Sequence, residues 1–177
     1  QCNILNLNSI KKIVKKIKPK ILIHCAGLSR PMKIHEKNIS KSIDLNIIGT
    51  ANITKVCKKY NIKLIYFSTG YVYEGKKGNY SENDPVKPFN NYALSKFGGE
   101  CSVAMYKNSL ILRITMTEKP FLHNKAFTNL KTNFMFHEDL VKILPKIITK
   151  KGILNVGGKS QSVYSFAKKY NKNIKKI

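Results

Sequence analysis

The chain contains almost no arginine, and this scarcity argues against a partner that its charge would otherwise suggest. Thirty-three basic residues against nine acidic ones give a net charge of +24, but Arg30 and Arg113 are the only arginines. Arginine is the side chain that most often reads bases and grips phosphates. The lysines are instead scattered along the chain, as in a protein from an AT-rich genome. We therefore expect no nucleic-acid partner, while the positive field suits an anionic metabolite such as a nucleotide diphosphate.

Paired cysteines and long apolar runs are also missing. None of the four cysteines lies in a CxxC pair or at zinc-like spacing from a histidine, so we expect free thiols and no metal. No window approaches 18 consecutive apolar residues, and Gln1-Cys2-Asn3 does not resemble a signal peptide. We expect no membrane segment and a reducing, cytoplasmic setting.

A third absence is the glycine-rich turn that opens a dinucleotide-binding fold. Neither GxGxxG nor GxxGxxG occurs in the 177 residues. Such a turn normally follows the central strand and holds the cofactor pyrophosphate at a helix N-terminus. We therefore expect that the first βα unit is absent from this sequence, and the missing motif does not argue against cofactor binding.

What is present is an alternation of strand and helix patterns, with 42% hydrophobic residues to build a core. The alternation predicts an α/β fold, a Rossmann-like, doubly wound parallel sheet with helices on both faces. Apolar residues at helical spacing predict helices over residues 10–17, after a Ser9 cap, and 40–60; helices are also expected over 137–150 and 162–170. Strands are expected over 20–26, 63–68 and 109–114, and a short strand and turn over 152–158. The segments 75–89 and 119–133 are expected to be irregular, and the first of them leads into a helix containing Tyr92 and Lys96.

Three residues point to chemistry. In Tyr92-Ala93-Leu94-Ser95-Lys96, a helix would place the phenol and the ammonium on one face, one turn apart. A nearby positive charge lowers the pKa of a phenol, which would make Tyr92 a usable proton donor. Thr69 follows an apolar run and would deliver a hydroxyl at the carboxyl edge of the sheet. A YxxxK pair alone recurs by chance, but with Thr69 it predicts carbonyl reduction.

With these residues the chain resembles the extended short-chain dehydrogenase/reductases, and within them the dTDP-4-dehydrorhamnose reductase family. The turn Ala26-Gly27-Leu28-Ser29 after a strand is similar to the family's cofactor turn. Asn3-Ile4 is similar to the family's Asp-hydrophobic pair near the adenine, with Asn in place of Asp. Asn46 matches the family's helix asparagine, and Phe67 matches the position before the end of the catalytic strand.

The resemblance implies a role for each of these positions. Asn3, Ile4, residues 26–29, Asn46 and Phe67 would contact NADPH or NADH, together with Tyr92 and Lys96. Hydride would pass to the C4 keto carbon of a UDP- or dTDP-linked 6-deoxy sugar while Tyr92 protonates the oxygen, Thr69 aligns it and Lys96 holds the ribose. Residues 1–118 would form the NAD(P)-binding domain, and 119–177 a small substrate-binding part with returning Rossmann elements. The resemblance also allows a homodimer, and the sequence leaves the oligomeric state open.

Differences from the family's usual residues indicate which of its members the chain resembles most. Gly70 and Met116, both expected near the substrate, stand where bacterial reductases usually have Asp and Trp. In both positions the chain looks more like the plant-type UDP-4-keto-6-deoxyglucose 3,5-epimerase/4-reductase. Tyr71 occupies the place of a cysteine that handles protons in related epimerase-reductases, so reduction is better supported than epimerisation. The alternative function is that of a non-catalytic binding protein like the regulatory subunit of methionine adenosyltransferase. That subunit resembles the same reductases and binds a dinucleotide without catalysing a reaction.

For some residues a purely structural role is an alternative to catalysis or ligand binding. His24, at a strand end, is more often a satisfied core histidine than a catalyst. Gly98-Gly99, inside a helix, more often permits close packing than phosphate binding. Asn46 could equally bridge backbone groups inside the fold.

Overall fold

The computed structural model describes residues 2–119, 121 and 123–177, and the chain divides into two compact units. The first unit runs to Arg113 and takes in Lys150–Asn155, and the second comprises Ile114–Thr149 and Val156–Ile177. The chain thus leaves the first unit and returns to it for one strand. No helix in the described part of the chain is long and apolar enough to cross a membrane.

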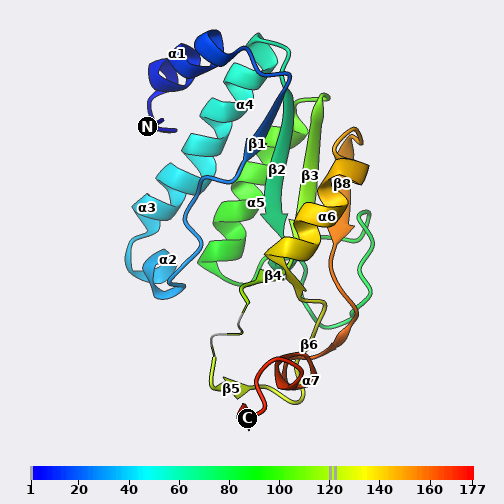
Figure 1. Ribbon diagram of the computed structural model, residues 1–177. Helices are drawn as coiled ribbons and strands as arrows, with labels where there is room; N and C mark the ends of the chain where they lie inside the picture. Colours follow the sequence, from blue (N-terminus) through cyan, green and yellow to red (C-terminus); the bar gives the residue numbers. More distant parts are fainter. Residues whose placement is uncertain (1, 120, 122) are drawn as a thin grey trace. The chain divides into compact units, whose positions relative to one another are not determined.

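The first unit is built on a four-stranded sheet in the order β1-β2-β3-β8 (Figure 1). The strands are β1 (Ile21–His24), β2 (Lys63–Thr69), β3 (Ser109–Ile114) and β8 (Gly152–Val156). β1 and β2 are parallel, with His24 opposite Tyr66, so their carboxyl ends lie at one edge. The central strands are nearly continuous apolar runs, as expected for a sheet buried on both faces. The predicted α/β fold with a parallel sheet is confirmed.

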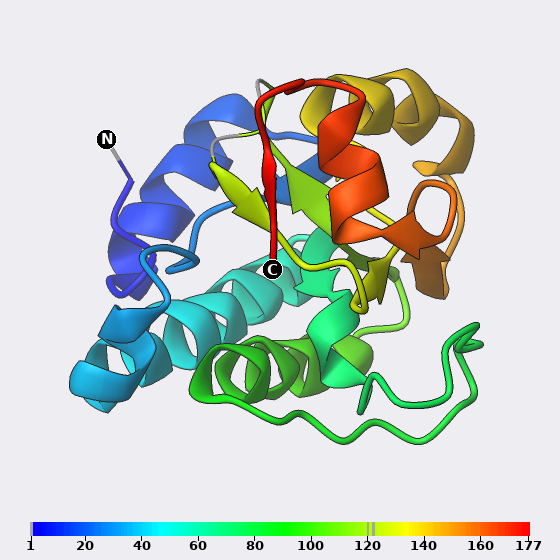
Figure 2. The same cartoon turned by 90° about the horizontal axis from the view of Figure 1, so that it is seen from below.

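Helices α4 (Gly49–Lys59) and α5 (Asn91–Ala104) lie side by side against this sheet (Figures 1 and 2). Helix α1 (Leu7–Ile17) packs on α4. Its Ile10 and Val14 are buried, because apolar residues at this spacing share one helix face. The cap is Asn6, whose side chain accepts from the backbone N–H groups of residues 8 and 9, so the predicted Ser9 cap is wrong by one turn.

The helix predicted over residues 40–60 is present but not uniform. It consists of α3 (Ile39–Ser42), a π-helical stretch η1 (Ile43–Ile48) and α4. A π turn inserts one extra residue into a helix and leaves no mark in hydrophobic periodicity, so the sequence could not show it. A short helix α2 (Lys33–Lys37), which the sequence pattern also did not indicate, precedes it.

A buried ion pair ties α5 to β3. Arg113 Nη2 lies 2.6 Å from Glu100 Oε1, and both side chains are about 5% exposed or less. The second carboxylate oxygen accepts from Ser68 Oγ at 2.5 Å, and Arg113 Nη1 donates to the phenol oxygen of Tyr73 at 2.7 Å. The pair therefore links β2, α5 and the start of the long loop that follows the 3-10 turn η2 (Gly70–Val72).

The second unit has its own small core, formed mainly by Phe136, Val163, Phe166 and Ala167. Its strands pair as β4 (Met116–Thr117) with β7 (Met135–Phe136), β5 (Lys125–Ala126) with β10 (Lys175–Lys176), and β6 (Lys131–Thr132) with β9 (Gln161–Ser162); its helices are α6 (His137–Ile147) and α7 (Val163–Lys168).

Both helices of the second unit fall inside the ranges predicted for them. The segment 119–133, expected to be irregular, contains only two-residue strands, and residues 120 and 122 within it lie outside the described part of the chain.

Candidate active site

Tyr92 and Lys96 occupy the first turns of α5, as the sequence predicted. Asn90 caps the helix, because its side-chain oxygen accepts from Ala93 N–H at 2.8 Å and so satisfies one of the free N–H groups of the first turn. The helix then begins at Asn91, which puts Tyr92 and Lys96 one turn apart on one face. Both side chains are half-buried.

Thr69 is the last residue of β2 and faces the phenol. Its hydroxyl accepts from Tyr71 N–H at 3.2 Å and so caps the 3-10 turn η2. The Thr69 hydroxyl also lies near enough to the Tyr92 phenol to favour its ionised form and so to lower its pKa. A strand end and a helix start thereby bring together the two groups that the sequence separates by 23 positions.

The electrostatics of Tyr92 differ from the prediction that Lys96 lowers its pKa. Burial raises the pKa of Tyr92, and the Thr69 hydroxyl and the charge of Arg30 only partly oppose that rise. The prediction is therefore wrong in sign and in the identity of the cation. Arg30 lies in the loop after β1, and nothing in the sequence pattern set it apart from a surface cation.

The pKa of Lys96 is also shifted strongly from that of a free lysine. Its ammonium lies 4.2 Å from the centre of the Tyr66 ring, inside the first unit. Burial lowers the pKa of Lys96 to about 8, although Glu100 and Cys25 favour its charged form. A lysine whose pKa is lowered this far by burial is more typical of a functional site than of a solvated surface.

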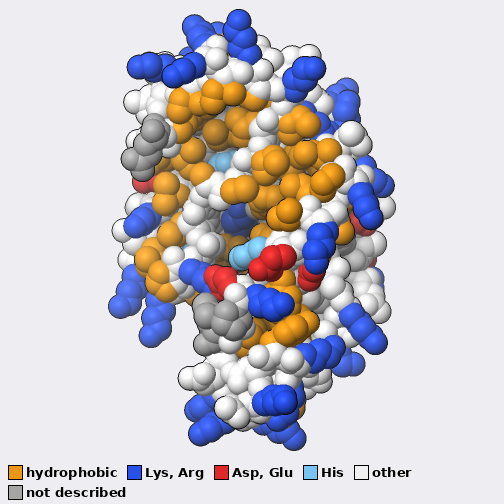
Figure 3. Space-filling model, in the orientation of Figure 1, with side chains coloured by type: hydrophobic (Ala, Val, Ile, Leu, Met, Phe, Trp, Pro, Cys, Tyr) orange, Lys and Arg blue, Asp and Glu red, His pale blue; other side chains and the backbone are white. Residues whose placement is uncertain are grey.

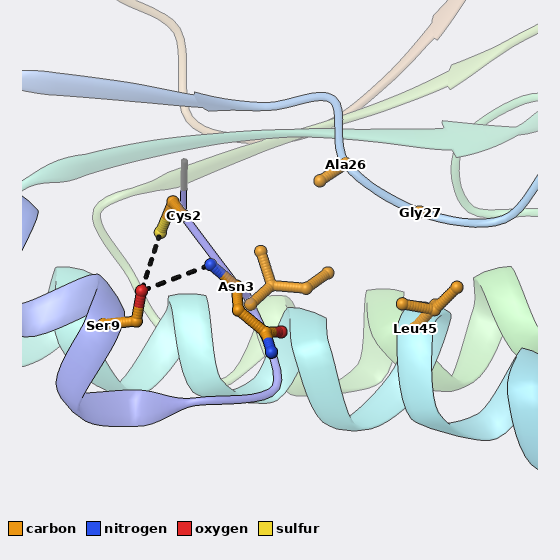
Figure 4. Close-up of a pocket in the computed structure, with 7 residues that line it drawn as sticks. Cys2, Asn3, Ser9, Ala26, Gly27 and Leu45 are labelled. Atoms are coloured by element: carbon orange, nitrogen blue, oxygen red, sulfur yellow. Dashed lines mark hydrogen bonds between the residues drawn. The ribbon is translucent and has the colours of Figure 1, made fainter.

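Four of the predicted cofactor residues come together in one pocket. Asn3, Ile4, Ala26 and Gly27 line a cavity of about 490 Å³, together with Cys2, Ser9 and Leu45, which the sequence analysis missed (Figure 4). The segment of Asn3 is held there because its backbone N–H donates to Ser9 Oγ at 3.2 Å. The pocket has room for part of a nucleotide, and a glycine leaves the backbone of the turn after β1 open to it.

Asn46 holds that turn in place. Its amide oxygen accepts from Leu28 N–H at 2.7 Å, and its amide nitrogen donates to Leu28 O and to Ser95 Oγ, each at 2.9 Å. Both amide hydrogens are thus used within the protein, so Asn46 would act on a cofactor through the loop. A Cβ on Gly27 would lie 2.8 Å from the same amide oxygen, which explains the glycine.

The remaining predicted site residues are spread more widely. Phe67 is half-buried on β2, Ser29 is exposed in the loop after β1, and Gly70 opens η2 beside Thr69. Met116 lies in β4 of the second unit, where it pairs with Met135. The cofactor and substrate roles of these residues stay predictions.

The structural roles considered for His24 and the glycine pair are confirmed. His24 is 3% exposed, and its Nε2 lies 3.0 Å from Thr50 Oγ1. A Cβ on Gly99 would lie 2.6 Å from the hydroxyl of Tyr66 and would also collide with Asn46 O, while one on Gly98 would meet Ile47. The glycines therefore let α5 approach its neighbours closely.

Three further observations concern thiols, metal ligands and charge. All four cysteines are free, as expected. Among the described residues, no three His, Cys, Asp or Glu side chains gather in a way that could hold a metal ion. Lysine and arginine side chains are scattered over the face drawn in Figure 3 and form no continuous stripe.

A parallel α/β sheet with a hydroxyl at a strand end, a tyrosine and a lysine one turn apart on the following helix, and a pocket beside the turn after β1 define a protein of the short-chain dehydrogenase/reductase class. The family model described as the RmlD substrate binding domain matches residues 1–134. The chain therefore belongs to this family.

Relatives of two kinds are similar to the chain. The beta subunit of methionine adenosyltransferase 2 from Danio rerio is 30% identical over 115 residues, covering 64% of this chain and 35% of that protein. The dTDP-4-dehydrorhamnose reductase of Aggregatibacter actinomycetemcomitans is 27% identical over 133 residues, covering 74% and 45%. The chain thus spans only about a third to a half of the length of these relatives.

The fold also matches solved structures. The crystal structure of dTDP-4-dehydrorhamnose reductase from Bacillus anthracis in complex with NADP superposes with a TM-score of 0.89 and 25% identity, covering 99% of this chain and 71% of that one. This similarity extends over both units of the chain and confirms the Rossmann-like architecture.

Proposed function

We propose that the protein is an NAD(P)H-dependent reductase of the C4 keto group of a nucleotide-linked 4-keto-6-deoxy sugar. The observation that carries the proposal is the arrangement of Thr69, Tyr92 and Lys96, with the Thr69 hydroxyl near enough to the Tyr92 phenol to act on its pKa and Lys96 one helical turn on. Family membership and the likeness to a reductase that binds NADP support it. The first unit would hold the cofactor and the second would contribute to sugar-nucleotide binding.

The chain's own residues account for the steps around the carbonyl. When bound, the reduced nicotinamide supplies the hydride. Thr69 would orient the keto oxygen and stabilise the charge that develops on it, and Tyr92 would donate the proton. Lys96 would bind the cofactor ribose and keep a positive charge beside the site. Arg30 favours the ionised phenol and so would aid proton release from Tyr92.

The finer assignment that we propose is a UDP-linked substrate. Gly70 and Met116, where bacterial enzymes usually have Asp and Trp, support it. Bifunctional 3,5-epimerisation would require a second proton carrier, and the nearness of Tyr71, whose ring centre lies 6.3 Å from that of Tyr92, supports it as a candidate for that role. Burial raises the pKa of Tyr71, so its phenol stays protonated near neutral pH and is not available to accept a proton, and reduction alone is the better-supported reaction.

A second candidate function is a non-catalytic dinucleotide-binding subunit. The similarity to the beta subunit of methionine adenosyltransferase 2 favours it. The two candidates differ in a single property, which is turnover at the reacting carbonyl.

The test mixes the full-length protein with NADPH or NADH and with UDP- or dTDP-4-keto-6-deoxyglucose, follows cofactor absorbance and identifies the sugar. Oxidation that requires an added epimerase supports a plain reductase, and oxidation without one supports the bifunctional enzyme. Cofactor binding with no oxidation under any combination would refute the reductase proposal and favour the regulatory subunit.

A further inference from the structure

Lys96 is held at both of its ends by a single side chain, that of Tyr66. The Lys96 ammonium lies 4.2 Å from the centre of the Tyr66 ring. The Tyr66 hydroxyl donates to the backbone carbonyl of Lys96 at 2.9 Å. The ring therefore receives the charged end of the lysine while the hydroxyl anchors the helix turn from which the lysine projects.

Tyr66 is itself fixed more firmly than any surface group could be. It lies in β2, between β1 and β3, and is fully buried. The His24 ring stacks on it at 5.7 Å between ring centres. Gly99 leaves the space for its hydroxyl, since a Cβ there would lie 2.6 Å from that oxygen. Burial raises the pKa of the phenol, so the hydroxyl stays protonated and remains a donor.

We propose that Tyr66 is the positioning residue of Lys96, with its ring face stabilising the ammonium and its hydroxyl fixing the backbone. A desolvated ammonium is costly, and an aromatic face offsets part of that cost without placing a negative charge beside the reacting phenol. A carboxylate in the same position would hold Lys96 as firmly but would oppose ionisation of Tyr92. The kinetic part of this inference rests on the proposed reductase function, and the spectroscopic part does not.

The other groups that face Lys96 set the background for its titration. Glu100, on the same helix, and Cys25, after β1, favour the charged form, while burial disfavours it. His24, across on β1, is neutral near pH 7, because burial and the charge of Lys96 lower its pKa to about 4. These groups are unchanged in Tyr66 variants, so a shift in the Lys96 pKa would report Tyr66 itself, and Tyr66→Phe separates the contribution of the ring from that of the hydroxyl.

The experiment is NMR of the full-length protein carrying ¹³C-labelled lysine, with the Lys96 signal assigned by its loss in Lys96→Arg. A methylene beside a ring face at this distance is shifted by the ring current. In wild type and in Tyr66→Phe we expect the shifted signal and an unchanged Lys96 pKa. In Tyr66→Met, which fills the space without an aromatic face, the shift should vanish and the pKa should fall by about one unit, as for loss of a desolvated cation–π contact.

Two controls separate position from general damage. Tyr106 is a second buried tyrosine of the same core, and its hydroxyl donates to Ile62 O at 3.1 Å. Tyr106→Met should destabilise the fold comparably while leaving the Lys96 signal and pKa unchanged. If Tyr66→Met does not fold, Tyr66→Leu, read at lower temperature, makes the same measurement.

The outcomes are distinct. An unshifted Lys96 signal in wild type, or the same pKa in wild type and the non-aromatic variants, would overturn the inference. A fall in Tyr66→Phe equal to that in Tyr66→Met would assign the effect to the hydroxyl and overturn the role of the ring. In activity assays the alkaline limb of kcat should move down with the Lys96 pKa in Tyr66→Met only. If wild type shows no turnover, the proposed function fails while the NMR result still decides the role of Tyr66.

Discussion

Replacing Glu100 with glutamine should destabilise the protein far more than an ordinary surface substitution. Glu100 receives Arg113 Nη2 at 2.6 Å and Nε at 3.1 Å on one oxygen, and Ser68 Oγ at 2.5 Å on the other. Glutamine has nearly the same shape but no charge and only one acceptor oxygen. The substitution therefore leaves the Arg113 guanidinium in a site with about 5% exposure and without its ion-pair partner, with the carboxylate of Glu82 as a remaining nearby negative charge.

The expected loss follows from that burial. Breaking a buried ion pair by removing one partner costs about 3–5 kcal/mol, because the remaining charge is uncompensated. The lower end applies here, since the glutamine carbonyl can still accept one bond and Arg113 keeps its bond to the Tyr73 hydroxyl at 2.7 Å. We expect about 3 kcal/mol, which at a urea m-value of about 2–3 kcal/mol per M lowers the midpoint by about 1 M or more.

Urea unfolding of the full-length protein measures this, with Asp139→Asn as the control. Asp139 also pairs with a cation, Lys142 at 3.2 Å, but both side chains are at least half exposed. Such a pair is worth less than about 1 kcal/mol. The double variant Glu100→Gln with Arg113→Met should recover part of the loss, because it removes the stranded charge. A loss below about 1 kcal/mol in the single variant would show that the reasoning about burial is wrong.

Three further predictions concern the site and its support. Tyr92→Phe should leave cofactor affinity near normal and reduce turnover by about 10²-fold or more, as expected for removal of a general acid; full activity in this variant would exclude the acid role. Gly99→Ala should lower the free energy of unfolding by about 1–3 kcal/mol through overpacking against backbone, whereas Gly98→Ala, whose Cβ would meet the Ile47 side chain and most closely its terminal methyl, should be near neutral. Equal thermal shifts for the two glycine variants would contradict this. His24 is buried and neutral with a pKa lowered to about 4, so below pH 6.5 the unfolded chain takes up a proton that the folded protein refuses. Stability should therefore fall by about 2 kcal/mol between pH 7 and pH 4.5, and His24→Gln should show a smaller fall; an identical pH slope in both proteins would refute the assignment.

Much of the fold could be predicted because the relevant signals are local. The strands β1, β2 and β3 and the helix α1 lie within a few residues of their predicted bounds, and α5 carries Tyr92 and Lys96 as predicted. The π-helical stretch Ile43–Ile48 could not be predicted, since it changes hydrogen bonding without changing composition. The start of α1 was misplaced because Asn6 and Ser9 are equally good caps in sequence, and only the packing of the chain decided between them.

The candidate site, like the fold, has some features that could be predicted from the sequence and others that could not. The spacing of Tyr92 and Lys96 on one helix face, and the position of Thr69 after an apolar strand, follow from the sequence, because helix and strand geometry relate neighbouring residues in a fixed manner. The charge states do not follow from it. Burial by distant segments raises the pKa of Tyr92 and lowers that of Lys96, and Arg30 proved to be the cation that favours the ionised phenol.

By itself, then, the sequence determined which chemistry-bearing residues this protein has and how they recur along helices and strands, since those relations depend only on backbone geometry. The tertiary structure alone decided that Asn46 holds the loop of Leu28, that Tyr66 lies under Lys96, and that Glu100 meets Arg113. These contacts join residues from 13 to 30 positions apart. Hydrogen bonds and charge interactions at such separations depend on where the folded chain places each group and on how much water it excludes.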